Sequence, residues 1–95
     1  MTGPDVDDLI RRLRARSVSS WSPERVATAR DAVQRLADLA ADAEDQPRRA
    51  VPRLHPMAIA DQLEVLAVDA TTAGADREAV AALFGQLAVE LAAAR

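Results

Sequence analysis

The chain has 95 residues and a formal net charge of −3, and 49% of its residues are hydrophobic but only 2% are aromatic. This length supports one hydrophobic core and leaves no room for a second, so we expect residues 1–95 to form a single domain. The absence of cysteine excludes disulfide bonds, zinc thiolate sites and thiol nucleophiles.

Composition favours helix over strand along the whole chain. Alanine, leucine, arginine, aspartate and glutamate dominate, whereas glycine and the aromatic residues are scarce. We therefore expect an all-α fold without a sheet. The expected architecture is a compact four-helix bundle with one short N-terminal helix and three longer amphipathic helices.

The first two helices are expected at about 5–16 and 23–45. Apolar residues recur on one side of the first helix, at Val6, Leu9, Ile10 and Leu13. Ser22 suits the N-cap of the second helix, and Pro23 suits its first helical position. Steps of three and four residues then predict one apolar stripe along the second helix, at Val26, Ala29, Val33, Leu36, Ala40 and Ala43.

Proline and arginine are concentrated at 46–55, between the second and third helices. A proline disfavours helical geometry in the residue before it, so this segment is expected to be extended. Its length exceeds the usual connection between helices, which predicts that it crosses an end of the bundle. We interpret His55 as the cap and Pro56 as the first residue of a third helix at 56–73.

The turn between the third and fourth helices is marked by Gly74 and Asp76. Gly74 is expected to stop the third helix in the left-handed conformation, which glycine adopts without steric cost. Asp76 suits the N-cap of a fourth helix at 76–94. The apolar stripe predicted for this helix consists of Val80, Leu83, Phe84, Leu87 and Leu91.

The third and fourth helices carry apolar residues behind their core faces. Those residues are Met57, Val65 and Val68 in the third helix and Val89 in the fourth. One interpretation is a helix that is covered on two sides by its own bundle. The other is a second face buried against another chain, and two-fold homodimers are the commonest oligomers. We favour the second interpretation and predict an isologous homodimer whose interface contains these four residues.

Seven arginines are candidates for binding an anion or an acidic partner: Arg11, Arg12, Arg14, Arg16, Arg48, Arg49 and Arg53. Asp7 and Asp8 lie four residues before Arg11 and Arg12, a spacing that favours ion pairs within the helix. If the first helix packs near the 46–55 segment, however, all seven arginines would share one face. Such a face could bind a phosphate backbone or an acidic protein.

Catalytic motifs are absent from the sequence. His55 has no neighbouring nucleophile, and the nearest carboxylate along the chain after it, Asp61, is six residues away, so we interpret His55 as structural. Neither the HExxH motif, an EF-hand loop nor a glycine-rich phosphate loop occurs. We therefore expect no catalytic residues, no metal site and no cofactor.

The location of the protein is also predicted from the sequence. No apolar run approaches the roughly 20 residues that span a bilayer. The amino terminus is acidic and lacks the apolar stretch of a secretory signal. We therefore expect a cytoplasmic protein that does not enter a membrane.

The function predicted from these features is that of a non-enzymatic protein-interaction module. It would associate with itself through the third and fourth helices, and a second protein partner is a further expectation. The alternative is an arginine-dependent nucleic-acid-binding or regulatory protein that uses the N-terminal helix and the 48–53 loop.

Overall fold

The computed structural model describes residues 3–95, with side chains from residue 6 onward. Its elements, in chain order, are α1 (Gly3–Arg14), the 3₁₀ turn η1 (Val18–Ser20), α2 (Pro23–Ala43), the 3₁₀ turn η2 (Pro56–Ala58), α3 (Ile59–Ala73) and α4 (Arg77–Ala93). The described range is 76% helical and contains no strand. The predicted all-α four-helix bundle is thus confirmed.

The predicted caps are present in the structure. The Ser22 hydroxyl accepts from the Arg25 N–H at 3.2 Å at the start of α2. The Asp76 carboxylate accepts from the Glu78 N–H at 2.9 Å at the start of α4. His55 Nδ1 accepts from the Met57 N–H at 3.1 Å, so this histidine caps a helical turn as expected. Each cap satisfies an N–H that has no partner inside its helix.

Several of the expected helix limits require correction. The first helix begins and ends two residues earlier than expected, at Gly3 and Arg14, and the second ends two residues earlier, at Ala43. The third begins with the 3₁₀ turn η2, and the fourth, Arg77–Ala93, is one residue shorter at each end. At the end of α2, Asp45 adopts a left-handed φ of 56°. Its neighbour Gln46 donates to the Ala41 carbonyl at 2.8 Å, which is the long hydrogen bond of a Schellman motif. The chain therefore leaves the helix before the predicted limit.

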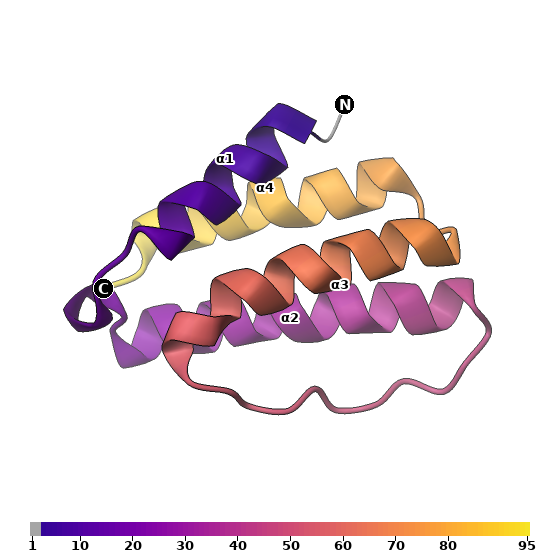
Figure 1. The fold of residues 1–95 in the computed structure, drawn as a ribbon, viewed down its shortest axis with the longest axis horizontal. Coiled ribbons are helices and arrows are strands. Elements are labelled where there is room, and N and C mark those ends of the chain that lie inside the picture. Colours follow the sequence, from indigo (N-terminus) through magenta and orange to yellow (C-terminus); the bar gives the residue numbers. More distant parts are fainter. Residues whose placement is uncertain (1–2) are drawn as a thin grey trace.

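Figure 1 shows how the four helices are arranged. Both α1 and α2 pack against α3 and α4. The helices α2 and α3 run in the same direction, whereas α4 returns in the opposite direction after the short turn at Gly74. Successive helices of a bundle usually run antiparallel when their connection is short, so the parallel pair depends on the long connection before α3.

The connection between α2 and α3, residues 44–55, is called the crossover segment here. It runs back along the length of α2, so the expectation that it would cross an end of the bundle is wrong (Figure 1). The physical reason is length: the 21 residues of α2 span about 31 Å at 1.5 Å per residue. The 12 residues of the crossover segment, when extended, reach about 40 Å, which is enough to return to the start of α2.

The core is built from the predicted apolar stripes, except that Ala43, the last residue predicted for the stripe of the second helix, is exposed. Its largest fully buried side chains are Leu36, Ile59, Leu63 and Leu87. Trp21 and Phe84, the two aromatic residues, are also buried. No polar or charged residue is buried in the described part of the chain. The bundle is thus held together by apolar packing, with its ionic contacts on the surface.

Candidate functional site

The four residues predicted to form an interface are all exposed. The exposed fractions are 43% for Met57, 56% for Val65, 59% for Val68 and 66% for Val89. The described residues of the chain therefore do not cover the outer face of α3, and the interpretation that its own bundle buries this face is wrong. These side chains remain free to contact a partner.

The exposed residues do not form one continuous surface. Val65 and Val68 are neighbours on α3, and Met57 lies two turns before Val65. All three side chains lie on the side of α3 opposite to the residues that α3 buries in the core. Val89 likewise lies opposite the buried residues of α4. Because α3 and α4 pack against α1 on one side and α2 on the other, their outer faces point away from each other.

Val68 also forms one wall of a shallow groove of about 260 Å³ between α1, α3 and the start of α4. The apolar residues of its lining are Val6, Ile10, Ala67, Val68 and Val80. Asp7, Glu64, Thr71 and Thr72 supply the polar part of the lining. Exposed valines and a groove of mixed apolar and polar lining therefore lie next to each other on this face of the bundle.

The arginines of α1 are largely paired with carboxylates of the chain itself. Asp8 binds Arg12 at 3.2 Å and Arg11 at 3.8 Å, so the Asp8–Arg12 pair is confirmed and Arg11 uses Asp8 instead of Asp7. The guanidinium of Arg16 lies 5.8 Å from the centre of the Trp21 ring, within cation–π range.

Arg14 joins α1 to α3. Its Nη2 atom lies 2.8 Å from both Asp61 Oδ1 and Glu64 Oε1. Hydrogen bonding to this guanidinium lowers the pKa of Glu64, because it stabilises the charged carboxylate. Arg14 therefore acts as a bridge between two helices, and its charge is already neutralised.

Two of the three arginines in the crossover segment form no ion pair with the described residues. Arg48 binds Asp42 at 2.7 Å and Asp38 at 3.9 Å, and the hydrogen bond lowers the pKa of Asp42. Within the described residues, Arg49 and Arg53 form no ion pair. Arg48 lies at the C-terminal end of α2, whereas Arg14 binds the start of α3 at the other end of the bundle. The seven candidate arginines therefore do not share one face.

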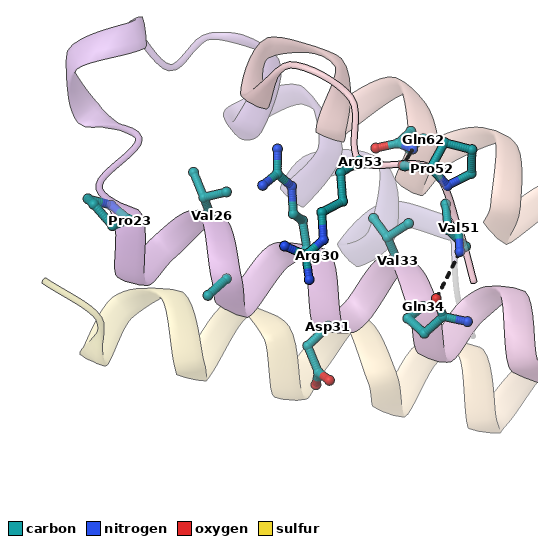
Figure 2. Close-up of a pocket in the computed structure, with 11 residues that line it drawn as sticks. Pro23, Val26, Arg30, Asp31, Val33, Gln34, Val51, Pro52, Arg53 and Gln62 are labelled. Carbon is teal, nitrogen blue, oxygen red and sulfur yellow. Dashed lines mark hydrogen bonds between the residues drawn. The ribbon is translucent and has the colours of Figure 1, made fainter.

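A larger groove, of about 530 Å³, lies between α2 and the crossover segment (Figure 2). It is lined by Pro23, Val26, Ala27, Arg30, Asp31, Val33, Gln34, Val51, Pro52, Arg53 and Gln62. Of these, only Arg53 is among the site residues predicted from the sequence. The groove depends on a segment that returns along α2, and no local pattern predicts that path.

Three side chains attach the crossover segment to the bundle. Gln34 Nε2 donates to the Arg49 carbonyl at 2.9 Å, and Gln34 Oε1 accepts from the Val51 N–H at 3.0 Å. Arg30 donates to the Leu54 carbonyl at 2.6 Å, and Gln62 donates to the Pro52 carbonyl at 3.2 Å. A segment without a neighbouring strand must satisfy its backbone groups in this way or with water.

His55 and the acidic side chains are the remaining candidates for chemistry among the described residues. His55 lines neither groove. No three His, Cys, Asp or Glu side chains gather closely enough there to hold a metal ion. The helices of the described range are too short or too polar to cross a bilayer. Comparisons with protein-family models, with curated proteins and with solved structures each found no significant match to this chain.

Proposed function

We propose that this chain is a non-enzymatic protein-interaction module that forms an isologous homodimer through the outer face of α3. The observation that carries the proposal is the exposure of Met57, Val65 and Val68, each of which keeps 43% or more of its surface accessible in the described chain. Burying such side chains is favourable by about 25 cal/mol for each Å² removed from water.

A second copy of the chain is the occupant that this face suits. In a two-fold dimer the same surface occurs on both sides, so it must be complementary to itself. The exposed valines form a ridge beside the groove that Val6, Ile10 and Val80 help to line. Rotation about a two-fold axis can place the ridge of each copy in the groove of the other.

The arrangement refines the interface predicted from the sequence. Stable dimers bury about 800 Å² on each partner, more than three side chains provide, so the proposed interface extends from α3 to the neighbouring surface of α1. Arg14, Asp61 and Glu64 form ionic contacts at the α1–α3 boundary and supply its polar rim. Val89 lies outside the proposed interface because it is on the outer face of α4, which points away from the outer face of α3.

Sedimentation velocity from about 1 to 100 µM tests the proposal. The unmodified chain is expected to shift from monomer to dimer over this range. The double variant Val65→Glu, Val68→Glu is expected to weaken the dimer by at least about tenfold, because each dimer would bury four carboxylates without partners. Circular dichroism would establish that the variant keeps its helices.

Two matched variants locate the interface. Val18→Glu alters a valine of η1 that is 61% exposed, and Val89→Glu alters the outer face of α4. Both are expected to dimerise like the unmodified chain. A monomer at every concentration, or a double variant that dimerises normally, would contradict the proposal. Loss of the dimer in Val89→Glu alone would move the interface to α4.

A further inference from the structure

Two arginine side chains, Arg30 and Arg53, line the groove between α2 and the crossover segment. Figure 2 shows Arg30 extending from α2 toward the crossover segment, and Arg53 extending from that segment toward α2. Arg30 donates one hydrogen bond, from Nη2 to the Leu54 carbonyl. Its Nε atom is buried and has no hydrogen-bond partner among the described residues. The groove lining thus carries two positive charges, and the remaining Arg30 donors are its terminal N–H groups.

The carboxylate within the groove lining does not neutralise these charges. Asp31 is the acidic residue of that lining, and its Oδ2 binds Arg35 Nη2 at 2.8 Å. Its carboxylate points away from Arg30 and Arg53 (Figure 2). Arg14 and Arg48, by contrast, each contact two carboxylates. Neither Arg30 nor Arg53 forms an ion pair within the described residues, so both positive charges of the groove lining are left without a carboxylate.

We propose that this groove binds a small molecule through an oxyanion, a phosphate or carboxylate group, held by Arg30 and Arg53. Guanidinium groups suit both anions because their N–H donors match pairs of acceptor oxygens. The volume of about 530 Å³ falls within the range of small-molecule pockets, about 300–1,000 Å³. Val26, Val33 and Val51 line the same groove and provide apolar surface for the rest of the ligand.

The amide side chains of the groove contribute by holding its shape. Gln34 and Gln62 use their amide groups to bind the backbone of the crossover segment. They therefore fix the segment that carries Arg53 at its distance from α2. Gln34 and Gln62 are therefore positioning residues, whereas Arg53 is proposed to contact the ligand.

Nuclear magnetic resonance of the arginine Nε–H groups tests the proposal directly. Inorganic phosphate and citrate are titrated separately into the full chain, and sodium chloride at matched ionic strength serves as the reference. We expect saturable shifts at Arg30 and Arg53 with at least one of the two anions. A response to phosphate alone assigns a phosphate ligand, and a response to citrate alone assigns a carboxylate ligand.

Arg53→Gln is the decisive variant, because Arg53 is exposed and forms no ion pair within the described residues, so its loss leaves the fold intact. It is expected to weaken anion binding by about tenfold or more, the loss of one charge-assisted contact. Arg49→Gln removes an exposed arginine of the same segment and should bind as the unmodified chain does.

Three results would overturn the proposal. The first is the absence of a saturable shift with either anion, and the second is normal binding by Arg53→Gln. The third is a shift of equal size at all exposed arginines, which indicates screening of charge and not a site. The double variant Val65→Glu, Val68→Glu should bind the anion normally, so failure of this site is distinguishable from failure of the dimer.

Discussion

At the scale of single residues, left-handed backbone decides where two helices stop. Gly74 ends α3 with a φ of 101°, and its neighbour Ala75 donates to the Ala70 carbonyl at 2.9 Å. Asp45 ends α2 by the same motif, at a position where the composition gives no glycine signal. Aspartate tolerates this conformation better than most residues, which makes the stop possible.

Gly74→Ala is expected to lower the free energy of unfolding by about 1 kcal/mol, because a Cβ strains the left-handed conformation. Gly85→Ala is the matched control: Gly85 lies within α4, and a Cβ there would have no atom within 4 Å. It should raise the free energy of unfolding by up to about 1 kcal/mol. Urea unfolding followed by circular dichroism measures both. Equal stability of Gly74→Ala and the parent would contradict the account of this stop.

At the scale of elements, the long connection sets the direction of α3, and one arginine adds an ionic contact between α1 and α3. The crossover segment allows α2 and α3 to lie parallel, and Gln34 binds it at two backbone positions. Arg14 attaches α1 to α3 through Asp61 and Glu64. These contacts join residues that are far apart in the sequence, so patterns within a single helix do not predict them.

The contact between α1 and α3 is expected to depend on pH. Arg14 lowers the pKa of Glu64 in the folded chain. The stabilisation is therefore complete above the pKa of an unfolded glutamate, about 4.3. It is lost as the pH falls through the lower pKa of the folded state. Thermal unfolding should thus show a larger decrease in Tm between pH 7 and pH 3 for the parent chain than for Arg14→Met.

Arg77→Met provides the control for this comparison, because Arg77 forms no ion pair within the described residues. The Tm of Arg77→Met should decrease between pH 7 and pH 3 by the same amount as the Tm of the parent chain. An Arg14→Met variant with the same acid sensitivity as the parent would show that the Arg14 contacts contribute nothing. Raised salt concentration should also reduce the difference, since all three side chains are partly exposed.

At the scale of the whole molecule, stability depends on one apolar core without disulfide bonds. Leu36 and Leu63 are completely buried, and they belong to α2 and α3, which pack closely together. A domain of this size has a free energy of unfolding of about 5–15 kcal/mol, a small difference between large opposing terms. Replacing a single core residue therefore removes a large fraction of the free energy of unfolding.

Leu63→Ala is expected to lower the free energy of unfolding by about 2–5 kcal/mol, through lost burial and the cavity that remains. Val89→Ala removes an exposed valine and should change it by less than about 0.5 kcal/mol. Chemical denaturation at a fixed protein concentration measures both variants. A loss below about 1 kcal/mol for Leu63→Ala would show that the surrounding helices close the cavity.

The sequence predicted the local part of the candidate sites well. Exposure of Met57, Val65, Val68 and Val89 follows from helical periodicity, and the structure confirms it. Arg30 was missed because the groove that it lines is completed by Arg53, which lies 23 residues further along the chain. The pairing of Arg14 with α3 was missed for the same reason.

The sequence by itself determined the number of helices, their caps and their buried stripes, because these features depend on residues within one or two helical turns. Only the tertiary structure decided the path of the crossover segment, the groove that Arg30 and Arg53 line together and the separation of Val89 from the α3 valines. Those arrangements depend on how whole helices pack, and many packings satisfy the same local pattern.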